Sequence, residues 1–158
     1  MKEKSILYII QGFIGSGKTT FSKKLANETG AIRLNPDELV CNMFSYDEYM
    51  TNWDNCFNYV MDIIWDKTKV YLHENNSVIL DMGFWLREDR DFARLVAREC
   101  HADFVHYFLN VPDEILKQRI IKDRPLGWVR KHLNDFESNK VKFVLPEKDE
   151  QAIIINNF

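Results

Sequence analysis

The sequence is poor in the residues that mark special protein classes. Its 158 residues include six glycines, four prolines and three cysteines, which excludes a collagen-like, low-complexity or disulfide-rich chain. Cys41, Cys56 and Cys100 are widely spaced and form no CxxC motif, so we interpret them as reduced core thiols rather than metal ligands. No apolar run approaches the ~18 residues of a membrane span, and the first ten residues lack a cleavable signal pattern. We therefore expect a cytoplasmic protein without a membrane partner.

The charge of the chain is nearly balanced. The 21 Lys and Arg residues and the 24 Asp and Glu residues give a net charge of −3, which provides no overall attraction to nucleic acid or to anionic lipid. A nucleic-acid partner is therefore not expected. The length and the 46% hydrophobic content are typical of one globular domain, which we place at residues 1–158. The sequence leaves the oligomeric state open.

Apolar runs typical of β-strands alternate along the chain with helical patterns. This alternation predicts an α/β fold in which helices cover a parallel sheet. The expected strands are residues 6–10, 31–34, 78–81, 104–109 and 152–155. The expected helices are residues 18–29, 46–74, 87–100 and 112–123, with Phe92, Leu95 and Val96 facing inward in the third and Gly30 ending the first.

A phosphate-binding motif follows the first expected strand. Residues 12–19, GFIGSGKT, satisfy the pattern G-x-x-x-x-G-K-[ST]. The glycines let the backbone turn its N–H groups toward phosphate oxygens, and the following helix adds its positive dipole end. We expect ATP and Mg²⁺ as cofactors, with Lys18 on the β- and γ-phosphates and the Thr19 hydroxyl on Mg²⁺. The expected nucleotide-binding residues are Gly12, Gly15, Ser16, Gly17, Lys18, Thr19 and Thr20.

Three later segments, taken in order with the phosphate loop, carry a resemblance to a known group. They are LNPDEL at residues 34–39, VILD at residues 78–81 with Arg90 nine residues on, and KQRIIKDR at residues 117–124. The chain resembles the P-loop kinase group that includes chloramphenicol phosphotransferase, zeta toxins and the kinase domain of polynucleotide kinase. The resemblance covers roughly residues 6–155. It implies a P-loop NTPase fold with five parallel strands in the order 2-3-1-4-5.

The resemblance also implies roles for two carboxylates. Asp37 follows the second strand, and in the resembling enzymes an Asp at this place accepts the proton of the substrate hydroxyl. The alternative is that Asp37 caps the helix that follows it. Asp81 ends an apolar strand, as a carboxylate does when it holds Mg²⁺ through water. The alternative for Asp81 is an ordinary residue at a strand end.

Two arginines fall in the segment that forms the lid of such kinases, here approximately residues 119–132. By the same resemblance, Arg119 and Arg124 neutralise charge on the transferring phosphoryl group, and the alternative is a solvated helix face. Residues 143–146, FVLP, fall where these kinases surround the adenine base. The catalytic residues expected from the sequence are therefore Lys18, Asp37, Arg119 and Arg124.

The acceptor is the least defined part of the expected function. Polynucleotide kinases and zeta toxins carry an Arg three residues after the base, whereas this chain has Val40, which argues against a phosphorylated or nucleic-acid acceptor. The aromatic and acidic residues between Tyr46 and Phe57 suit a neutral or cationic hydroxyl compound, such as an antibiotic or a nucleoside, although aromatic residues at helical spacing also form cores. Residues 83–85, GFW, are a second candidate wall of the acceptor pocket.

The expected function is an ATP- and Mg²⁺-dependent phosphotransferase with a small-molecule alcohol as acceptor. One alternative is a kinase of the zeta-toxin or polynucleotide type. Another is an ATP-binding regulator without an acceptor. A GTPase switch is not expected, because NKVK at residues 139–142 lacks the aspartate of the [NT]-K-x-D guanine motif.

Overall fold

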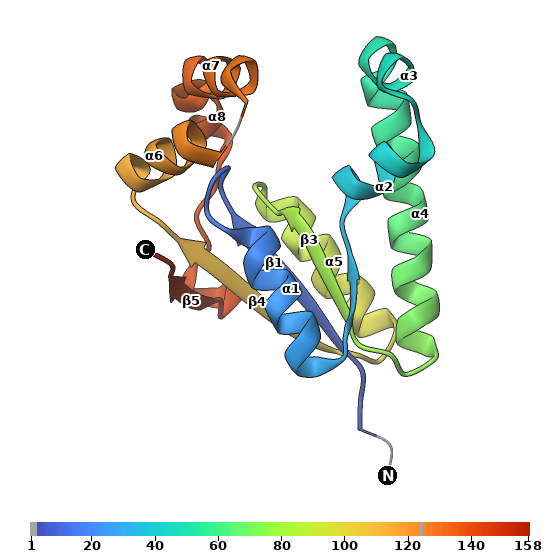
Figure 1. Cartoon of the computed structure of the whole chain (residues 1–158). Helices are drawn as coiled ribbons and strands as arrows, with labels where there is room; N and C mark the ends of the chain where they lie inside the picture. Colours follow the sequence, from blue (N-terminus) through green and yellow to red (C-terminus); the bar gives the residue numbers. More distant parts are fainter. Residues whose placement is uncertain (1–2, 124) are drawn as a thin grey trace.

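A five-stranded parallel sheet lies at the centre of the computed structural model, which describes residues 3–123 and 125–158. Its strand order is β2-β3-β1-β4-β5, with β1 in the middle (Figure 1). This is the predicted order, and all four strand pairings are parallel, as predicted. The strands are β1 (Ile6–Gly12), β2 (Ile32–Leu34), β3 (Val78–Gly83), β4 (Asp103–Asn110) and β5 (Ile153–Asn156).

Helices cover both faces of the sheet because side chains along β1 point alternately to the two faces. Tyr8 and Ile10 pack with α1 (Lys18–Thr29) on one face. Leu7 and Ile9 pack with α4 (Trp53–His73) and α5 (Arg87–Glu99) on the other face. The helix α1 has the predicted bounds, and Gly30 ends it with a positive φ of 70°.

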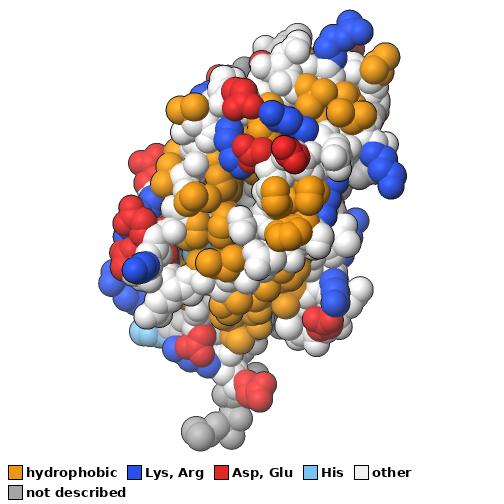
Figure 2. Space-filling view, turned by 90° about the vertical axis from the view of Figure 1, so that its left-hand side faces the viewer, with side chains coloured by type: hydrophobic (Ala, Val, Ile, Leu, Met, Phe, Trp, Pro, Cys, Tyr) orange, Lys and Arg blue, Asp and Glu red, His pale blue; other side chains and the backbone are white. Residues whose placement is uncertain are grey.

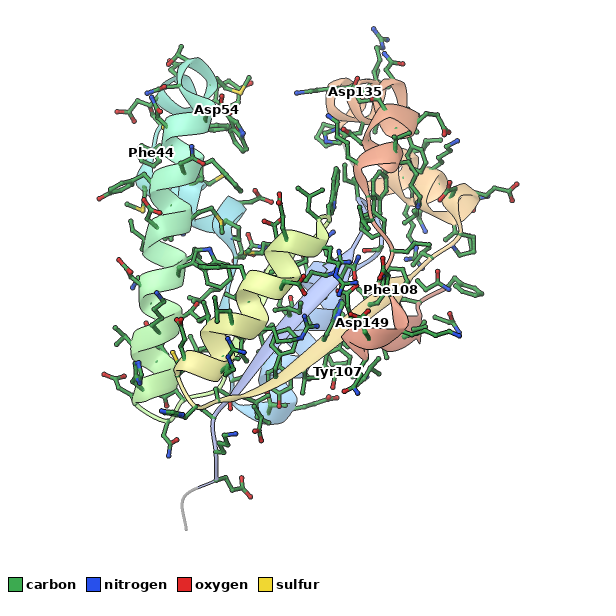
Figure 3. The ribbon with its side chains drawn as sticks, turned by 180° about the vertical axis from the view of Figure 1, so that it is seen from behind. Phe44, Asp54, Tyr107, Phe108, Asp135 and Asp149 are labelled. Atoms are coloured by element: carbon green, nitrogen blue, oxygen red, sulfur yellow. The ribbon has the colours of Figure 1, made fainter. Side chains whose placement is uncertain are left out.

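Two groups of helices project beyond the carboxyl ends of the strands (Figures 1 and 3). One group contains α2 (Pro36–Met43), α3 (Tyr46–Thr51) and the beginning of α4. The other, the lid group, contains α6 (Asp113–Asp123), α7 (Leu126–Asn134) and α8 (Phe136–Lys142) around a core that includes Leu116, Val129 and Phe136. Asp54 and Asp135 mark the outer ends of the two groups in Figure 3.

The helix predicted at residues 46–74 is two helices. Ser45 and Glu48 form a capping box that starts α3, and α3 ends at Asn52, whose backbone is not helical. Asn52 accepts a hydrogen bond from the side-chain amide of Asn55 at 2.8 Å. The backbone of Asn52 still donates to Glu48 and accepts from Cys56, so the interruption is one of backbone direction at Asn52, and the helix restarts at Trp53. The sequence predicts no bounds for the short helices α2, α7 and α8, since none is long enough to show a clear period, and a helix at α2 enters only as the alternative role of Asp37.

Two predictions of burial are wrong in part. Phe92 is 43% exposed and packs edge-on against Trp65, while Arg90 and Ala93 are fully buried on α5. The inner face of α5 therefore contains a charged residue, which a search for apolar periodicity passes over. Among the cysteines, Cys56 and Cys100 are buried but Cys41 is exposed on α2, so Cys41 is not a core thiol.

The outer strand β5 leaves apolar side chains on the surface. Ile153 and Ile154 are 47% and 59% exposed, and Figure 2 shows hydrophobic side chains gathered on this side of the molecule. Within the described ranges, no helix is long and apolar enough to cross a membrane. A single 3₁₀ turn, Lys148–Glu150, comes just before β5 and brings Glu150 into the interior.

Candidate nucleotide and phosphoryl-transfer site

The phosphate loop connects β1 to α1 in a tight turn, in which the N–H of Ser16 donates to the carbonyl of Phe13 at 3.1 Å. Gly17 has φ +90° and stands at the N-cap of α1, and a Cβ built on it would lie 2.7 Å from Nδ2 of Asn157. A Cβ on Gly12 would lie 2.4 Å from Oγ of Ser16. Only glycine therefore fits at these two positions. The loop has the tight turn that the motif predicts, at the N-terminus of a helix, where an anion is stabilised.

Lys18 and Ser16 lie within this loop. Lys18 Nζ donates to the carbonyl of Phe13 at 3.0 Å, so its ammonium group lies over the turn. The hydroxyl of Ser16 is buried and makes no hydrogen bond to any part of the chain that the structure describes. A buried hydroxyl of this kind is rare unless a ligand completes its bonding. Thr19 and Thr20 are exposed in the first turn of α1.

Asp81 ends the buried part of β3 and is almost inaccessible. Its Oδ2 accepts from the hydroxyl of Ser22 on α1 at 2.7 Å and from Nη2 and Nε of Arg33 at 2.7 and 3.1 Å. Arg33 also donates from Nη1 and Nη2 to the two carboxylate oxygens of Glu38, both at 2.9 Å. No sequence motif indicates Ser22 or Arg33, because Asp81, their shared partner, is 59 and 48 positions away along the chain.

The electrostatic state of this cluster follows from its hydrogen bonds. Burial alone would lower the pKa of Arg33, but the hydrogen bonds to Glu38 and Asp81 raise it above its ordinary value. The hydrogen bond from Arg33 lowers the pKa of Glu38. Arg33 and Glu38 are therefore both charged at neutral pH.

Asp37 lies in the first turn of α2, at the same edge of the sheet as the phosphate loop. The N-cap of α2 is Asn35, whose Oδ1 accepts from the backbone N–H of Glu38 at 2.9 Å. The alternative interpretation of Asp37 as the cap is therefore wrong. Asn35 also donates from Nδ2 to the carbonyl oxygen of Asp81 at 3.0 Å. This bond attaches the start of α2, and with it Asp37, to β3.

Arg119 on α6 contacts the outside of the phosphate loop. It lies 3.4 and 3.5 Å from the carbonyl oxygens of Gly15 and Ser16 and donates to the carbonyl of Asn157 at 2.6 Å. Asn157 in turn donates to the carbonyl of Ser16 at 2.8 Å. Asn157 lies outside every recognisable motif, so the sequence gives no sign of its contact with the loop. Arg124, the second predicted lid arginine, lies outside the described residues.

Residues 7–126 match the sequence family described as AAA domain. The chain belongs to this AAA domain family. No curated protein matches the sequence significantly. The fold is similar to that of Kti12 from Chaetomium thermophilum in complex with ADP-AlF3, with a TM-score of 0.69 and 13% identity over 94% of this chain and 88% of that chain.

Two other solved structures have a similar fold. The first is a gluconokinase from Sinorhizobium meliloti 1021, with a TM-score of 0.61 and 16% identity over 99% of this chain and 83% of that chain. The second is a shikimate kinase from Bacteroides thetaiotaomicron, with a TM-score of 0.60 and 17% identity over 96% of this chain and 86% of that chain. These similarities show that the AAA domain has the P-loop NTPase fold.

The donor atoms at the phosphate loop of the AAA domain fit Mg²⁺. The Thr19 hydroxyl and the Asp81 carboxylate are hard oxygen ligands, and Mg²⁺ is usually held by one or two such groups together with water and phosphates. No group of three or more His, Cys, Asp or Glu side chains that could hold a metal by itself occurs in the described ranges. The fit is therefore to a metal that arrives with a nucleotide.

The predicted adenine segment packs close to the phosphate loop of the AAA domain. Phe143 lies edge-on to Phe13, with ring centroids 5.5 Å apart, and Trp85 stacks on Phe13 at 5.0 Å. The N–H of Val144 donates to the carbonyl of Trp85 at 2.9 Å. Phe84 is buried in the core, so of the second candidate wall Gly83, which pairs with Gln11, and Trp85 lie near the loop. Contact of residues 143–146 with adenine stays a prediction.

A ladder of aromatic rings runs along the helical group that contains α2. The rings of Tyr46, Tyr49, Trp53 and Phe57 follow one another with each centroid 5.5 Å from the next. Tyr49 and Phe57 pack against the core, whereas Tyr46 and Trp53 are 66% and 44% exposed. The ladder is therefore partly core, and its exposed rings belong to the surface of this group.

A buried polar cluster lies behind the phosphate loop. Gln11, the residue before Gly12, donates to the carbonyl of Val144 at 2.8 Å, and its Oε1 lies 2.8 Å from Nε2 of His106. Arg90 donates to the same carbonyl of Val144 at 3.2 Å and to both carboxylate oxygens of Glu150. Burial lowers the pKa of His106 to about 4, so this imidazole is neutral.

Proposed function

We propose that the protein is a kinase that transfers the γ-phosphoryl group of ATP to a hydroxyl group of a small molecule. The bond between Asn35 and the carbonyl of Asp81 carries the proposal, because it attaches the helix of Asp37 to the strand beside the phosphate loop. Binding of a nucleotide with Mg²⁺ needs no carboxylate at this edge beyond that of Asp81. A phosphotransferase needs one to accept the proton of the attacking hydroxyl.

In the proposed reaction, the residues of the site act on the phosphates of ATP, on the acceptor hydroxyl and on Mg²⁺. The N–H groups of the loop and Lys18 bind the β- and γ-phosphates. Asp37 accepts the proton of the acceptor hydroxyl while the hydroxyl oxygen bonds to the γ-phosphorus. The bond from the γ-phosphorus to the oxygen that bridges it to the β-phosphorus breaks, which releases ADP. Thr19 and Asp81 would hold Mg²⁺, which when bound neutralises charge on the phosphates. Arg119 and Arg124 are proposed to stabilise the charge that develops on the transferring group.

The surroundings of Asp37 support a neutral or cationic acceptor. Val40, which stands where related kinases place a phosphate-binding Arg, is buried in the core at 1% exposure. The helical group around it presents the exposed rings of Tyr46 and Trp53 and the exposed carboxylates of Asp47 and Asp54. Aromatic faces and carboxylates together attract cations and stack on flat rings. An antibiotic or a nucleoside fits these requirements better than a phosphorylated compound or a nucleic acid.

A second candidate function is an ATP-binding regulator with no small-molecule acceptor. The fold alone does not decide against it, because the similarity to Kti12 in complex with ADP-AlF3, at a TM-score of 0.69, concerns the fold and not an acceptor. The two functions differ in ATP turnover. A kinase releases little ADP until an acceptor is supplied, whereas a regulator hydrolyses ATP at its own rate or when a protein partner binds.

The test is a screen of hydroxyl compounds with purified protein, ATP and Mg²⁺. The panel contains cationic amino sugars, nucleosides, neutral sugars, sugar phosphates and an oligonucleotide with a free 5′-hydroxyl. We expect ADP release and a product heavier by one phosphoryl group with a member of the first three classes. The Lys18→Ala variant is the control, because it removes the loop cation and should abolish transfer. ADP release that no compound accelerates would contradict the kinase proposal.

A further inference from the structure

The carboxylate of Asp81 is held by only one of its two oxygens. The three hydrogen bonds that reach it from the described residues all end on Oδ2, one from Ser22 and two from Arg33. The Asp81 side chain is 1% exposed, and no hydrogen bond from the described residues to Oδ1 is present. A buried carboxylate normally uses both oxygens as acceptors. This arrangement orients the carboxylate and leaves Oδ1 available at the carboxyl end of β3.

Arg33 holds Asp81 without cancelling the negative charge of the site. Its guanidinium donates to Asp81 on one side and to both oxygens of Glu38 on the other. The cluster contains two carboxylates and one guanidinium, so its formal charge is −1. A cation that approaches Oδ1 therefore still meets one net negative charge. Without Glu38, the guanidinium would neutralise Asp81 and weaken its attraction for a metal.

The same cluster joins the metal carboxylate to the helix of Asp37. Glu38 follows Asp37 in the first turn of α2, and its backbone N–H is bound by Asn35 at 2.9 Å. Asp81 is thus connected to this turn twice, through its side chain and Arg33, and through its carbonyl oxygen and Asn35. Two connections between the same elements restrict both the distance and the rotation of α2 relative to β3.

We propose that Arg33 is a positioning residue that holds Asp81 by Oδ2 and reserves Oδ1 for the water shell of nucleotide-bound Mg²⁺, while Glu38 preserves the negative charge of the site. The proposal rests on the function proposed above and assigns a role to two residues that the motif analysis did not reach. Partners of this kind around a metal ligand typically contribute 10–100-fold to metal affinity. Arg33 is suited to the task because a planar guanidinium presents five N–H donors in a fixed geometry, whereas the three donors of a lysine ammonium rotate about a single point charge.

The experiment measures how much Mg²⁺ tightens ATP binding, without any need for an acceptor. Calorimetry gives the dissociation constant of ATP in EDTA and in excess Mg²⁺. The constant in EDTA divided by the constant in excess Mg²⁺ reports the contribution of the metal to ATP binding. We expect Arg33→Lys and Glu38→Gln each to lower this ratio by roughly 10–100-fold and to leave the constant in EDTA unchanged. Melting temperatures are recorded for every variant.

The matched controls come from the pair formed by Lys24 and Glu28 on α1. This pair is exposed, at 74% and 59% of the side chains, with its charged atoms 3.8 Å apart. Lys24→Gln and Glu28→Gln change the charge of the protein as much as the test variants do, or more, but touch neither Asp81 nor α2. They should leave the ratio at its wild-type value, so a general effect of charge is separated from the effect of the cluster.

The outcomes separate this proposal from the kinase proposal. If Arg33 only stabilises the fold, the variants lower the melting temperature and leave the ratio unchanged, which overturns the positioning role alone. If Arg33→Lys does not fold, Glu38→Gln decides, because half of the Glu38 side chain is exposed and its loss leaves Arg33 still paired with Asp81. A wild-type protein whose ATP affinity is independent of Mg²⁺ would overturn both the positioning role and the Mg²⁺-dependent function.

Discussion

Arg90 and Glu150 form an ion pair in which both side chains are completely buried, with Nε and Oε1 2.6 Å apart. Arg90 also donates to the carbonyl oxygens of Phe84 and Val144, both at 3.2 Å. Phe84 follows β3, and Val144 lies where the chain returns from the lid group. The pair therefore joins α5, the end of β3 and the returning chain behind the phosphate loop.

Removal of Arg90 should destabilise the protein strongly. In Arg90→Met, Glu150 would be a buried charge without a partner, which typically costs about 3–5 kcal/mol. Urea denaturation measures this loss, with Lys24→Met as the control, since an exposed pair contributes only about 0–1 kcal/mol. The double variant Arg90→Met/Glu150→Leu should recover part of the loss because it buries no unpaired charge. A single variant as stable as the wild type would contradict this account.

The stability of the protein should fall as the pH decreases from about 6.5 to 4. Burial lowers the pKa of His106 from 6.5 to about 4; the charge of Glu150 opposes this effect, and the charges of Arg90 and Arg94 add to it. Between these values the unfolded state binds a proton that the folded state does not bind, so stability rises with pH in this window. Protonation would also place a second N–H at Nδ1, which is buried without a hydrogen-bond partner among the described residues.

Denaturation curves at several pH values, for the wild type and for His106→Gln, test this prediction. The variant should lose most of the slope between pH 6.5 and 4.5. Glu150 acts in a separate window: burial raises its pKa, but the hydrogen bonds from Arg90 and from the backbone of Glu147, together with the charge of Arg90, outweigh burial and lower the pKa from 4.5 to about 2. The stability that Glu150 contributes is complete above pH 4.5 and is lost only as the pH falls toward 2. An unchanged slope in His106→Gln would show that other groups control the upper window.

Asp37 and Asn35 should respond differently to substitution. Asp37→Asn should bind ATP and Mg²⁺ and melt like the wild type, yet lose transfer by roughly 10²–10⁴-fold, because an amide cannot accept the proton. Asn35→Ala should instead lose roughly 0.5–2 kcal/mol of stability, since Asn35 is the cap of α2. Turnover with the acceptor from the screen and thermal melting separate the two effects. A fully active Asp37→Asn variant would remove Asp37 from the mechanism.

Arg119 and Asn157 provide a matched test of the predicted lid arginine. Both contact the carbonyl of Ser16, but only Arg119 is charged. Asn157→Ala should weaken ATP binding and leave kcat near the wild-type value. Arg119→Ala should lower kcat more than it raises the KM for ATP, because a lid arginine acts mainly on charge in the transition state. If the two variants show the same pattern, Arg119 only supports the loop.

The nucleotide site could be predicted from the sequence because its signals are local. The glycines at positions 12, 15 and 17 and the residues Lys18 and Thr19 lie within eight consecutive positions, where a motif can be read directly. The helix bounds at Lys18 and Thr29 follow from the same local signals, namely the glycines that precede and follow them. The α/β class follows from the alternation of apolar runs with helical patterns. The strand order came only from the resemblance to P-loop kinases.

The polar clusters that support the site were decided by tertiary structure alone. Arg33 and Asp81 are 48 positions apart, and Arg90 and Glu150 are 60 apart, so no periodic pattern relates the members of either pair. Apolar burial leaves a period in the sequence because any apolar neighbour stabilises it. A buried charge needs one specific partner with the right geometry, and the fold supplies that partner from a distant segment. The sequence by itself therefore determined the phosphate-loop motif, and the fold determined which side chains surround the carboxylates of Asp81 and Glu150.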